Sequence, residues 1–151
     1  MSKAVMLSIR PKWVEKIASG EKTIEVRKTR PKLTPPFMAY IYCSRGSDAR
    51  RLHGSWGKVI GDFTCDQFWI GTPHNTNPLF CMAACMDGFD TEKYAKGKTL
   101  YGWHISDLRI YDTPKELSEF TGLRDTKFGA APYEIKRPPQ SWCYVEAMKD
   151  E

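Results

Sequence analysis

The chain has 151 residues, of which 41% are hydrophobic and 13% aromatic, and this is the composition of a globular protein with a core that needs no disulfides. The formal net charge of +5 suits an anionic partner, although many enzymes carry similar charge. No apolar run approaches the roughly 20 residues of a membrane span, and the N-terminus lacks the apolar segment of a signal peptide. We therefore expect one domain over residues 1–151, in the cytoplasm and without membrane contact.

The beginning of the chain predicts a strand, a short helix and a second strand. Val5–Ile9 is an apolar run typical of a buried strand. Pro11 suits the first turn of a helix, where its missing N–H costs no hydrogen bond, and Gly20 suits the left-handed cap. Thr23–Arg27 then alternates polar and apolar residues, which indicates a half-buried strand.

The rest of the chain predicts mainly strands. A short helix is expected at Asp90–Ala95, and the capping box Thr113–Glu116, with proline at the first helical position, predicts another helix start. Because turns and short helices separate the strands without a regular βαβ rhythm, we predict an α+β, mainly β fold. We expect a small, mostly antiparallel barrel with peripheral helices. Its further strands are expected at Phe37–Cys43, Lys58–Cys65, Tyr101–Tyr111 and Ser141–Glu146.

Cysteine spacing bears on metal binding. The odd number of cysteines, in a chain without an export signal, favours reduced thiols over a disulfide framework. Cys81 and Cys85 form a C-x3-C pair with His74 upstream and His104 downstream, which is half of a zinc site. No second close pair completes it, so we expect buried thiols, no metal and no cofactor.

Charged residues gather at the ends of the first three elements. Arg10 and Lys12 stand at the start of the expected helix, where N–H groups favour anions, and Lys22 follows its cap. Glu25 and Arg27 are two residues apart on a strand, so they share a face and can pair. Lys22 can meet Glu25 only if the chain turns between them. This pattern predicts a site for an anionic or polar ligand, with a solvated face as the plain alternative.

Two segments, Leu7–Trp13 and Gly20–Lys28, closely resemble the opening of ASCH domains, a family defined by homology to the activating signal cointegrator. Its hallmark G-x-K-x-x-E-x-R is met by Gly20, Lys22, Glu25 and Arg27. Tyr101–Leu108 and Pro139–Val145 are similar to later strands of the family. The resemblance covers most of the chain and implies a PUA-like β-barrel with a cleft beside the first helix and second strand.

The resemblance also implies nucleic-acid binding, because ASCH domains are thought to bind RNA and related barrels bind modified bases. We therefore predict that a basic cleft binds RNA or a modified nucleotide. The expected binding residues are Ser8, Arg10, Lys12, Lys22, Glu25, Arg27, Lys28 and Tyr144.

Two other functions stay open. Some small bacterial ASCH members hydrolyse the acetyl amide of N4-acetylcytidine and a few relatives cut RNA, so Lys22 and Glu25 are the catalytic candidates of a small hydrolase. The amidohydrolase members resemble the chain at Lys22 but place a threonine nucleophile where this chain has Glu25, and we therefore favour binding. The apolar run Phe68–Ile70 suits a protein partner instead.

Overall fold

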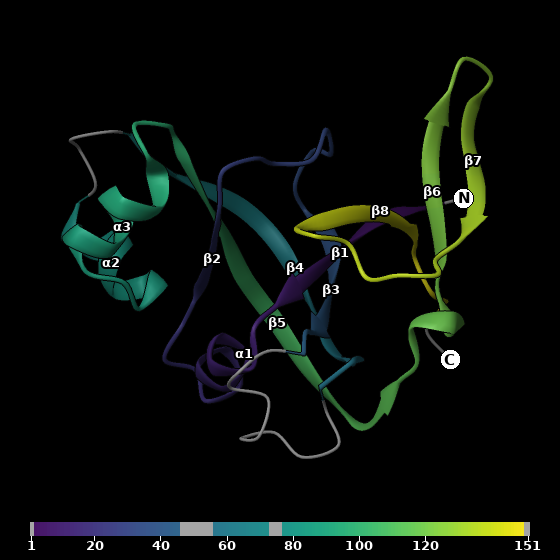
Figure 1. Ribbon diagram of the computed structural model, residues 1–151, viewed down its shortest axis with the longest axis horizontal. Coiled ribbons are helices and arrows are strands. Elements are labelled where there is room, and N and C mark those ends of the chain that lie inside the picture. The colour runs from purple at the N-terminus through teal and green to yellow at the C-terminus, as the bar shows by residue number, and fades with distance from the viewer. Residues whose placement is uncertain (1, 46–55, 73–76, 150–151) are drawn as a thin grey trace.

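The computed structural model describes residues 2–45, 56–72 and 77–149 (Figure 1), and it confirms the predicted α+β fold dominated by strands. None of the described helices is long and apolar enough to cross a membrane. The elements, in chain order, are β1 (Lys3–Ile9), α1 (Pro11–Ala18), β2 (Ile24–Arg27), β3 (Phe37–Cys43), β4 (Lys58–Gly71), α2 (Pro78–Ala84), α3 (Gly88–Ala95), β5 (Leu100–Lys115), a 3-10 turn (Leu117–Glu119), β6 (Thr121–Thr126), β7 (Gly129–Glu134) and β8 (Trp142–Glu146).

The strands form one eight-stranded sheet in the order β2-β5-β4-β3-β1-β8-β6-β7. Only β1 and β3 pair in parallel, and every other described pair is antiparallel, as predicted. Within residues 2–45, 56–72 and 77–149, no strand pairing joins β2 to the other end of the sheet. The expected closed barrel is therefore not confirmed, and the sheet is open along its backbone.

Side chains nevertheless join β2 and the loop after it to β8. The indole N–H of Trp142 donates to Thr29 Oγ1 at 2.9 Å. The hydroxyl of Tyr144 accepts from the backbone N–H of Lys32 at 2.8 Å. Arg27 makes a third connection, described below. The first and sixth strands of the sheet order thus lie across a seam held by side chains rather than by a β ladder.

Both faces of the central strands are covered, which explains why β1 and β3 are almost continuously apolar. Val5 and Ile41 belong to a core cluster that contains the α1 residue Ile17. Met6 and Tyr40 point to the opposite face and pack with Phe120 and Val145, among others. Alternate side chains of the same strand therefore pack into two different cores.

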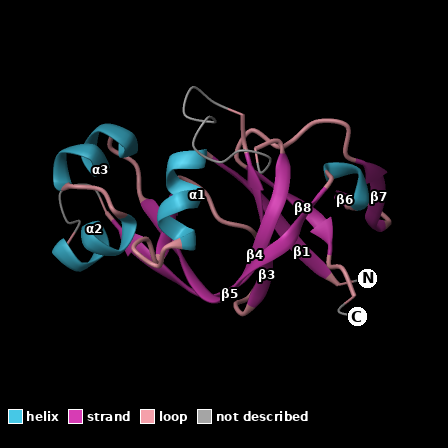
Figure 2. Ribbon diagram, turned by 90° about the horizontal axis from the view of Figure 1, so that it is seen from below, coloured by secondary structure: helices cyan, strands magenta, loops and turns pink. Residues whose placement is uncertain are grey.

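A third core cluster joins β2 to α2. Ile24 and Val26 are buried there with Phe80 and Ala84. Figure 1 shows α2 and α3 at one end of the molecule, with the β6–β7 hairpin and both termini at the other. Helix α1 lies between that helix pair and the larger part of the sheet (Figure 2). Because Ile24 and Val26 face α2, the alternate residues Glu25 and Arg27 face α1 and β8.

One element prediction is wrong. The capping box at Thr113–Glu116 does not begin a helix, because β5 continues to Lys115, which pairs with Val59. Glu116 caps only the short 3-10 turn that follows. The predicted strand Lys58–Cys65 is present but continues to Gly71, and α2, β6 and β7 had no sequence counterpart.

Candidate functional site

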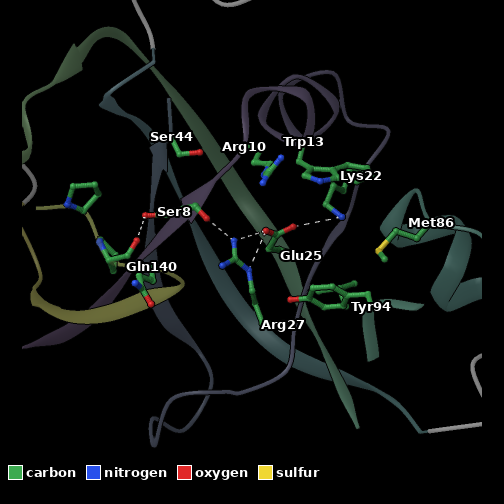
Figure 3. A pocket seen from close by; sticks show the side chains of 13 residues that line it. Ser8, Arg10, Trp13, Lys22, Glu25, Arg27, Ser44, Met86, Tyr94 and Gln140 are labelled. Atoms are coloured by element: carbon green, nitrogen blue, oxygen red, sulfur yellow. Dashed lines mark hydrogen bonds and ion pairs between the residues drawn. The ribbon is translucent and has the colours of Figure 1, made fainter. Parts of the chain in front are cut away.

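A pocket of about 400 Å³ lies between α1, β2, α3 and the loop before β8 (Figure 3). Its lining brings together residues that are up to 132 positions apart, from Ser8 to Gln140. Five predicted site residues line it: Ser8, Arg10, Lys22, Glu25 and Arg27.

Three charged residues form a buried group at the bottom of the pocket. Glu25 Oε2 accepts from Arg27 Nη2 at 2.8 Å and from Nε at 3.3 Å. Glu25 Oε1 lies 3.5 Å from Lys22 Nζ. Only 2% of Lys22, 5% of Glu25 and 9% of Arg27 is exposed, so these charges are held away from bulk water. The expected pairing of Glu25 with Arg27 on one strand face is confirmed.

Arg27 is fully engaged by protein groups. Besides its two bonds to Glu25, its Nη2 donates to the carbonyl of Ser8 at 2.7 Å, and its Nη1 donates to the carbonyl and hydroxyl of Ser141 at 3.1 and 3.0 Å. These are as many hydrogen bonds as a guanidinium has N–H groups. Arg27 therefore connects β2 to β1 and to the residue before β8, and it offers a ligand positive charge rather than a vacant N–H.

Lys22 connects the pocket to α2. Its Nζ donates to the carbonyl of Ala84, the last residue of α2, at 2.6 Å. A cation at this position satisfies a terminal carbonyl and complements the negative end of the helix dipole. The turn that brings Lys22 to Glu25, as the sequence required, is made at Gly20, which has a φ of +87°.

The electrostatics of Lys22 follow from its burial. Loss of solvent lowers the pKa of Lys22 from its ordinary value, while the nearby Glu25 carboxylate opposes this shift and Arg27 reinforces it. Its Nζ also lies 4.8 Å from the centre of the Trp13 ring. Lys22 is thus a desolvated amine between an aromatic face, a carbonyl and a carboxylate.

Two predicted residues stand at the edge of the pocket in different states. Ser8 Oγ donates to the carbonyl of Pro139 at 2.6 Å, so its proton is already used. Arg10 is exposed, and no hydrogen bond or ion pair holds its guanidinium among the described residues. Arg10 is consequently the cation at this pocket that is best placed to meet a ligand anion.

Three other predicted residues do not line the pocket. Lys12 stands on the outer side of α1, with its Nζ 4.7 Å from the Trp13 ring centre. Lys28 lies behind the pocket wall, 4.7 Å from the ring centre of Tyr94. Tyr144 belongs to the seam, where its hydroxyl accepts a backbone N–H. A binding role for these three would require a ligand that extends beyond the pocket.

The sequence did not predict the aromatic walls. Trp13 is half-buried and lines the pocket, and Tyr94 of α3 lines it from the other side. The other lining residues that were not predicted are Val26, Ser44, Met86, Pro138, Pro139 and Gln140. Tyr94 belongs to a predicted helix, but nothing in its local sequence indicated that α3 folds against β2.

The cysteines and histidines considered as half of a zinc site have other surroundings in the structure. All five cysteines are free thiols, and the described residues contain no group of three metal-binding side chains. His104 pairs with Asp66, its Nδ1 lying 2.6 Å from Oδ1, whereas His74 lies outside the described residues.

In the apolar run Phe68–Ile70, Phe68 and Trp69 are half-buried. Phe68 packs edge to face against Trp103 with ring centres 5.6 Å apart, and Trp69 stacks on His104. Only Ile70 is largely exposed, at 51%. A single exposed isoleucine offers little surface to a protein partner.

Residues 7–65 match the family model of the ASCH domain. The resemblance to ASCH domains is confirmed. Lys22, Glu25 and Arg27 all lie inside the matched segment, and so do Ser8 and Arg10. Tyr94 and Gln140 lie beyond it, so the pocket is completed by parts of the chain outside the matched segment.

The fold agrees with solved ASCH structures. ASCH from Zymomonas mobilis is 19% identical, with a TM-score of 0.61 over 95% of this chain and 87% of that one. A tyrosine-to-phenylalanine variant of the same protein is 18% identical, with a TM-score of 0.63 over 96% and 91% of the two chains. At this identity the likeness establishes the fold alone. No curated protein sequence matches the chain.

Proposed function

We propose that this protein binds RNA or a single nucleotide, with a modified base as one candidate, in the pocket beside α1 and β2. The observation that carries the proposal is the charge of the pocket. Arg10, Lys22 and Arg27 line it together with a single acidic residue, Glu25. A concave, partly desolvated site with an excess of cations favours a phosphate-bearing ligand. The family match supports the same conclusion, because nucleic-acid binding is generally proposed for ASCH domains.

The hydrogen-bonding atoms that remain free in the pocket indicate how a nucleotide is oriented when it binds. Since Arg27 is saturated, the polar atoms left for a ligand at the bottom are Glu25 Oε1 and the remaining N–H of Lys22, an acceptor beside a donor. Such a pair complements a base edge better than a phosphate, which offers only acceptors. Arg10 at the rim then meets the phosphate, and Trp13 or Tyr94 can stack on the base, a contact that contributes about 1–3 kcal/mol.

Fluorescence anisotropy with labelled single-stranded RNA over a range of salt concentrations tests the proposal. We expect affinity to fall steeply with salt, and Arg10→Ala to weaken binding and to reduce the slope of log K against log salt by about one. The matched control is Lys16→Ala on the same helix, because Lys16 pairs with Glu21 and does not line the pocket. Absence of binding to single-stranded, duplex and modified RNA would refute the proposal.

One observation supports hydrolysis as a second candidate function. Lys22 Nζ and Glu25 Oε1, 3.5 Å apart in a buried pocket, are an acid and a base within reach of one water molecule. Hydrolysis of a nucleoside amide or an RNA phosphodiester would be lost in Glu25→Gln. Turnover assays on N4-acetylcytidine and on RNA distinguish the two proposals, because a protein that only binds its ligand shows no turnover.

We also propose that residues 1–151 form one domain of PUA-like architecture, in which the side-chain seam between β2 and β8 takes the place of the last β ladder. Free thiols at all five cysteines suit a reducing compartment such as the cytoplasm.

A further inference from the structure

We propose that Lys22 is a nucleophilic lysine that captures an aldehyde group on a nucleotide as an imine. The inference rests on the proposed nucleotide pocket and specifies a ligand class for it: a nucleotide whose base carries a formyl group. Three observations support it, namely the geometry around Nζ, its desolvation, and a carboxylate placed to move protons.

The geometry leaves one position of Nζ unoccupied. Of its three positions beyond Cε, the carbonyl of Ala84 takes one at 2.6 Å and Glu25 Oε1 faces another at 3.5 Å. Among the residues that the structure describes, no acceptor bonds to the third. Glu25 is held more closely by Arg27, at 2.8 Å, and is therefore first of all the counterion of Arg27. Lys22 keeps a fixed orientation in the pocket without a tight ion pair of its own.

The surroundings favour the neutral amine, which is the nucleophilic form. Lysines become reactive when they are desolvated in a pocket or placed beside another cation. Lys22 meets both conditions, since 98% of its surface is buried and Arg27 contacts the other oxygen of the same carboxylate, Glu25. Burial lowers the pKa of Lys22 and Arg27 adds to this, while Glu25 opposes it without cancelling it.

Imine formation needs no reactant besides the Lys22 amine and the aldehyde of the ligand. The Lys22 ammonium gives one proton to Glu25, and the amine lone pair then forms a C–N bond to the aldehyde carbon while a proton moves from nitrogen to oxygen. Glu25 returns its proton to the resulting hydroxyl, which leaves as water, and the protonated imine forms. An ammonium and an aldehyde thus give an iminium and water, with no change in oxidation state, and hydrolysis reverses the step.

Borohydride-type trapping tests this chemistry. A single-stranded oligonucleotide with one 5-formylpyrimidine is incubated with the protein and sodium cyanoborohydride, and the adduct is located by peptide mass spectrometry. We expect adduct on the peptide that contains Lys22, none with the unformylated oligonucleotide, and at least a tenfold loss in Lys22→Arg, which keeps the cation but cannot form this imine. Lys16→Met, a change outside the pocket, should leave the yield unchanged.

Several outcomes would overturn the inference. Adduct spread over surface lysines, or adduct retained in Lys22→Arg, refutes it. A formylated oligonucleotide that binds without being trapped also refutes it, but leaves the proposed nucleotide-binding function intact. A free aromatic aldehyde trapped at Lys22 in a protein that binds no oligonucleotide would support the amine chemistry and refute the nucleotide function. If Lys22→Arg does not fold, as thermal melting would show, the position of the adduct in the unchanged protein decides.

Discussion

At the scale of single residues, the site depends on how Arg27 and Lys22 share one buried carboxylate. Arg27 makes the shorter contacts to Glu25 and also bonds to Ser8 and Ser141, so its loss would leave Glu25 with the 3.5 Å contact to Lys22 alone. A buried charge without a close partner is costly, whereas an intact buried pair is nearly neutral. Arg27 therefore matters for the fold at least as much as for the ligand.

We expect Arg27→Ala to lower the free energy of unfolding by about 3–5 kcal/mol, because it breaks a buried pair and the connection between β2 and β8. Urea denaturation measures the change. Arg30→Ala serves as the control, since Arg30 is exposed and its guanidinium faces the rings of Phe68 and Tyr101 without a buried ion pair. A loss below about 1 kcal/mol for Arg27→Ala, the value of a surface ion pair, would contradict the structural role.

Cysteine reactivity gives a prediction with a pH dependence. Burial raises the pKa of Cys65 from 9.0 to about 12, and its thiol donates to the carbonyl of Gln67 at 3.4 Å. Because the thiolate is the reactive form, Cys65 should resist iodoacetamide at pH 8 in the folded protein, while the half-buried Cys81 and Cys85 react first. Peptide mass spectrometry measures the labelling. Early modification of Cys65 under native conditions would contradict the burial.

At this scale, the sequence predicts which side chains of a strand share a face. The spacing of Glu25 and Arg27 was enough to predict their pairing, because strand alternation fixes which side chains share a face. It could not show that the pair is buried, that Arg27 bonds to Ser141, or that Lys22 reaches Ala84, 62 residues away. Those contacts depend on how distant elements pack, which local patterns do not encode.

At the scale of elements, β1, α1 and β2 were predictable because hydrophobic periodicity, Pro11 and Gly20 all indicate the same structure. The β6–β7 hairpin was not, because most of its residues are exposed and it shows no apolar alternation. The capping box at Thr113–Glu116 failed for the opposite reason. Its local helix signal is overridden by pairing of β5 with β4.

The irregular pairing of β4 gives a prediction at this scale. The register of β4 shifts at Gly61 against both β3 and β5. A Cβ at Gly61 would clash with the backbone carbonyl of Arg109, which cannot move away as a flexible side chain can. We therefore expect Gly61→Ala to destabilise the protein by about 1–3 kcal/mol.

Thermal or urea unfolding measures this loss, and Gly88→Ala is the matched control. A Cβ at Gly88 meets no atom within 4 Å, and the residue begins α3, so its replacement should be neutral or slightly stabilising. Equal stability of the two variants would show that β4 and β5 do not approach each other closely at Gly61.

At the scale of the whole molecule, one arrangement explains both the fold and the pocket. The two core faces of β1 and β3 fix the central strands, and the α2–α3 pair packs on the outer face of β2. Arg27 and the seam residues Trp142 and Tyr144 then hold β2 and its loop against β8. The pocket lies where these parts meet, so its shape depends on the closure of the seam and on the docking of α2.

The most direct test of the nucleotide pocket is an amide NMR titration of the isotope-labelled protein with single-stranded RNA or a tight-binding nucleotide. We predict that the largest shift changes occur at Trp13, Glu25, Tyr94 and Gln140, which line the pocket from four separate segments, while Lys16 and the β6–β7 hairpin stay unchanged. Shift changes confined to another surface, or none at saturating ligand, would contradict the account.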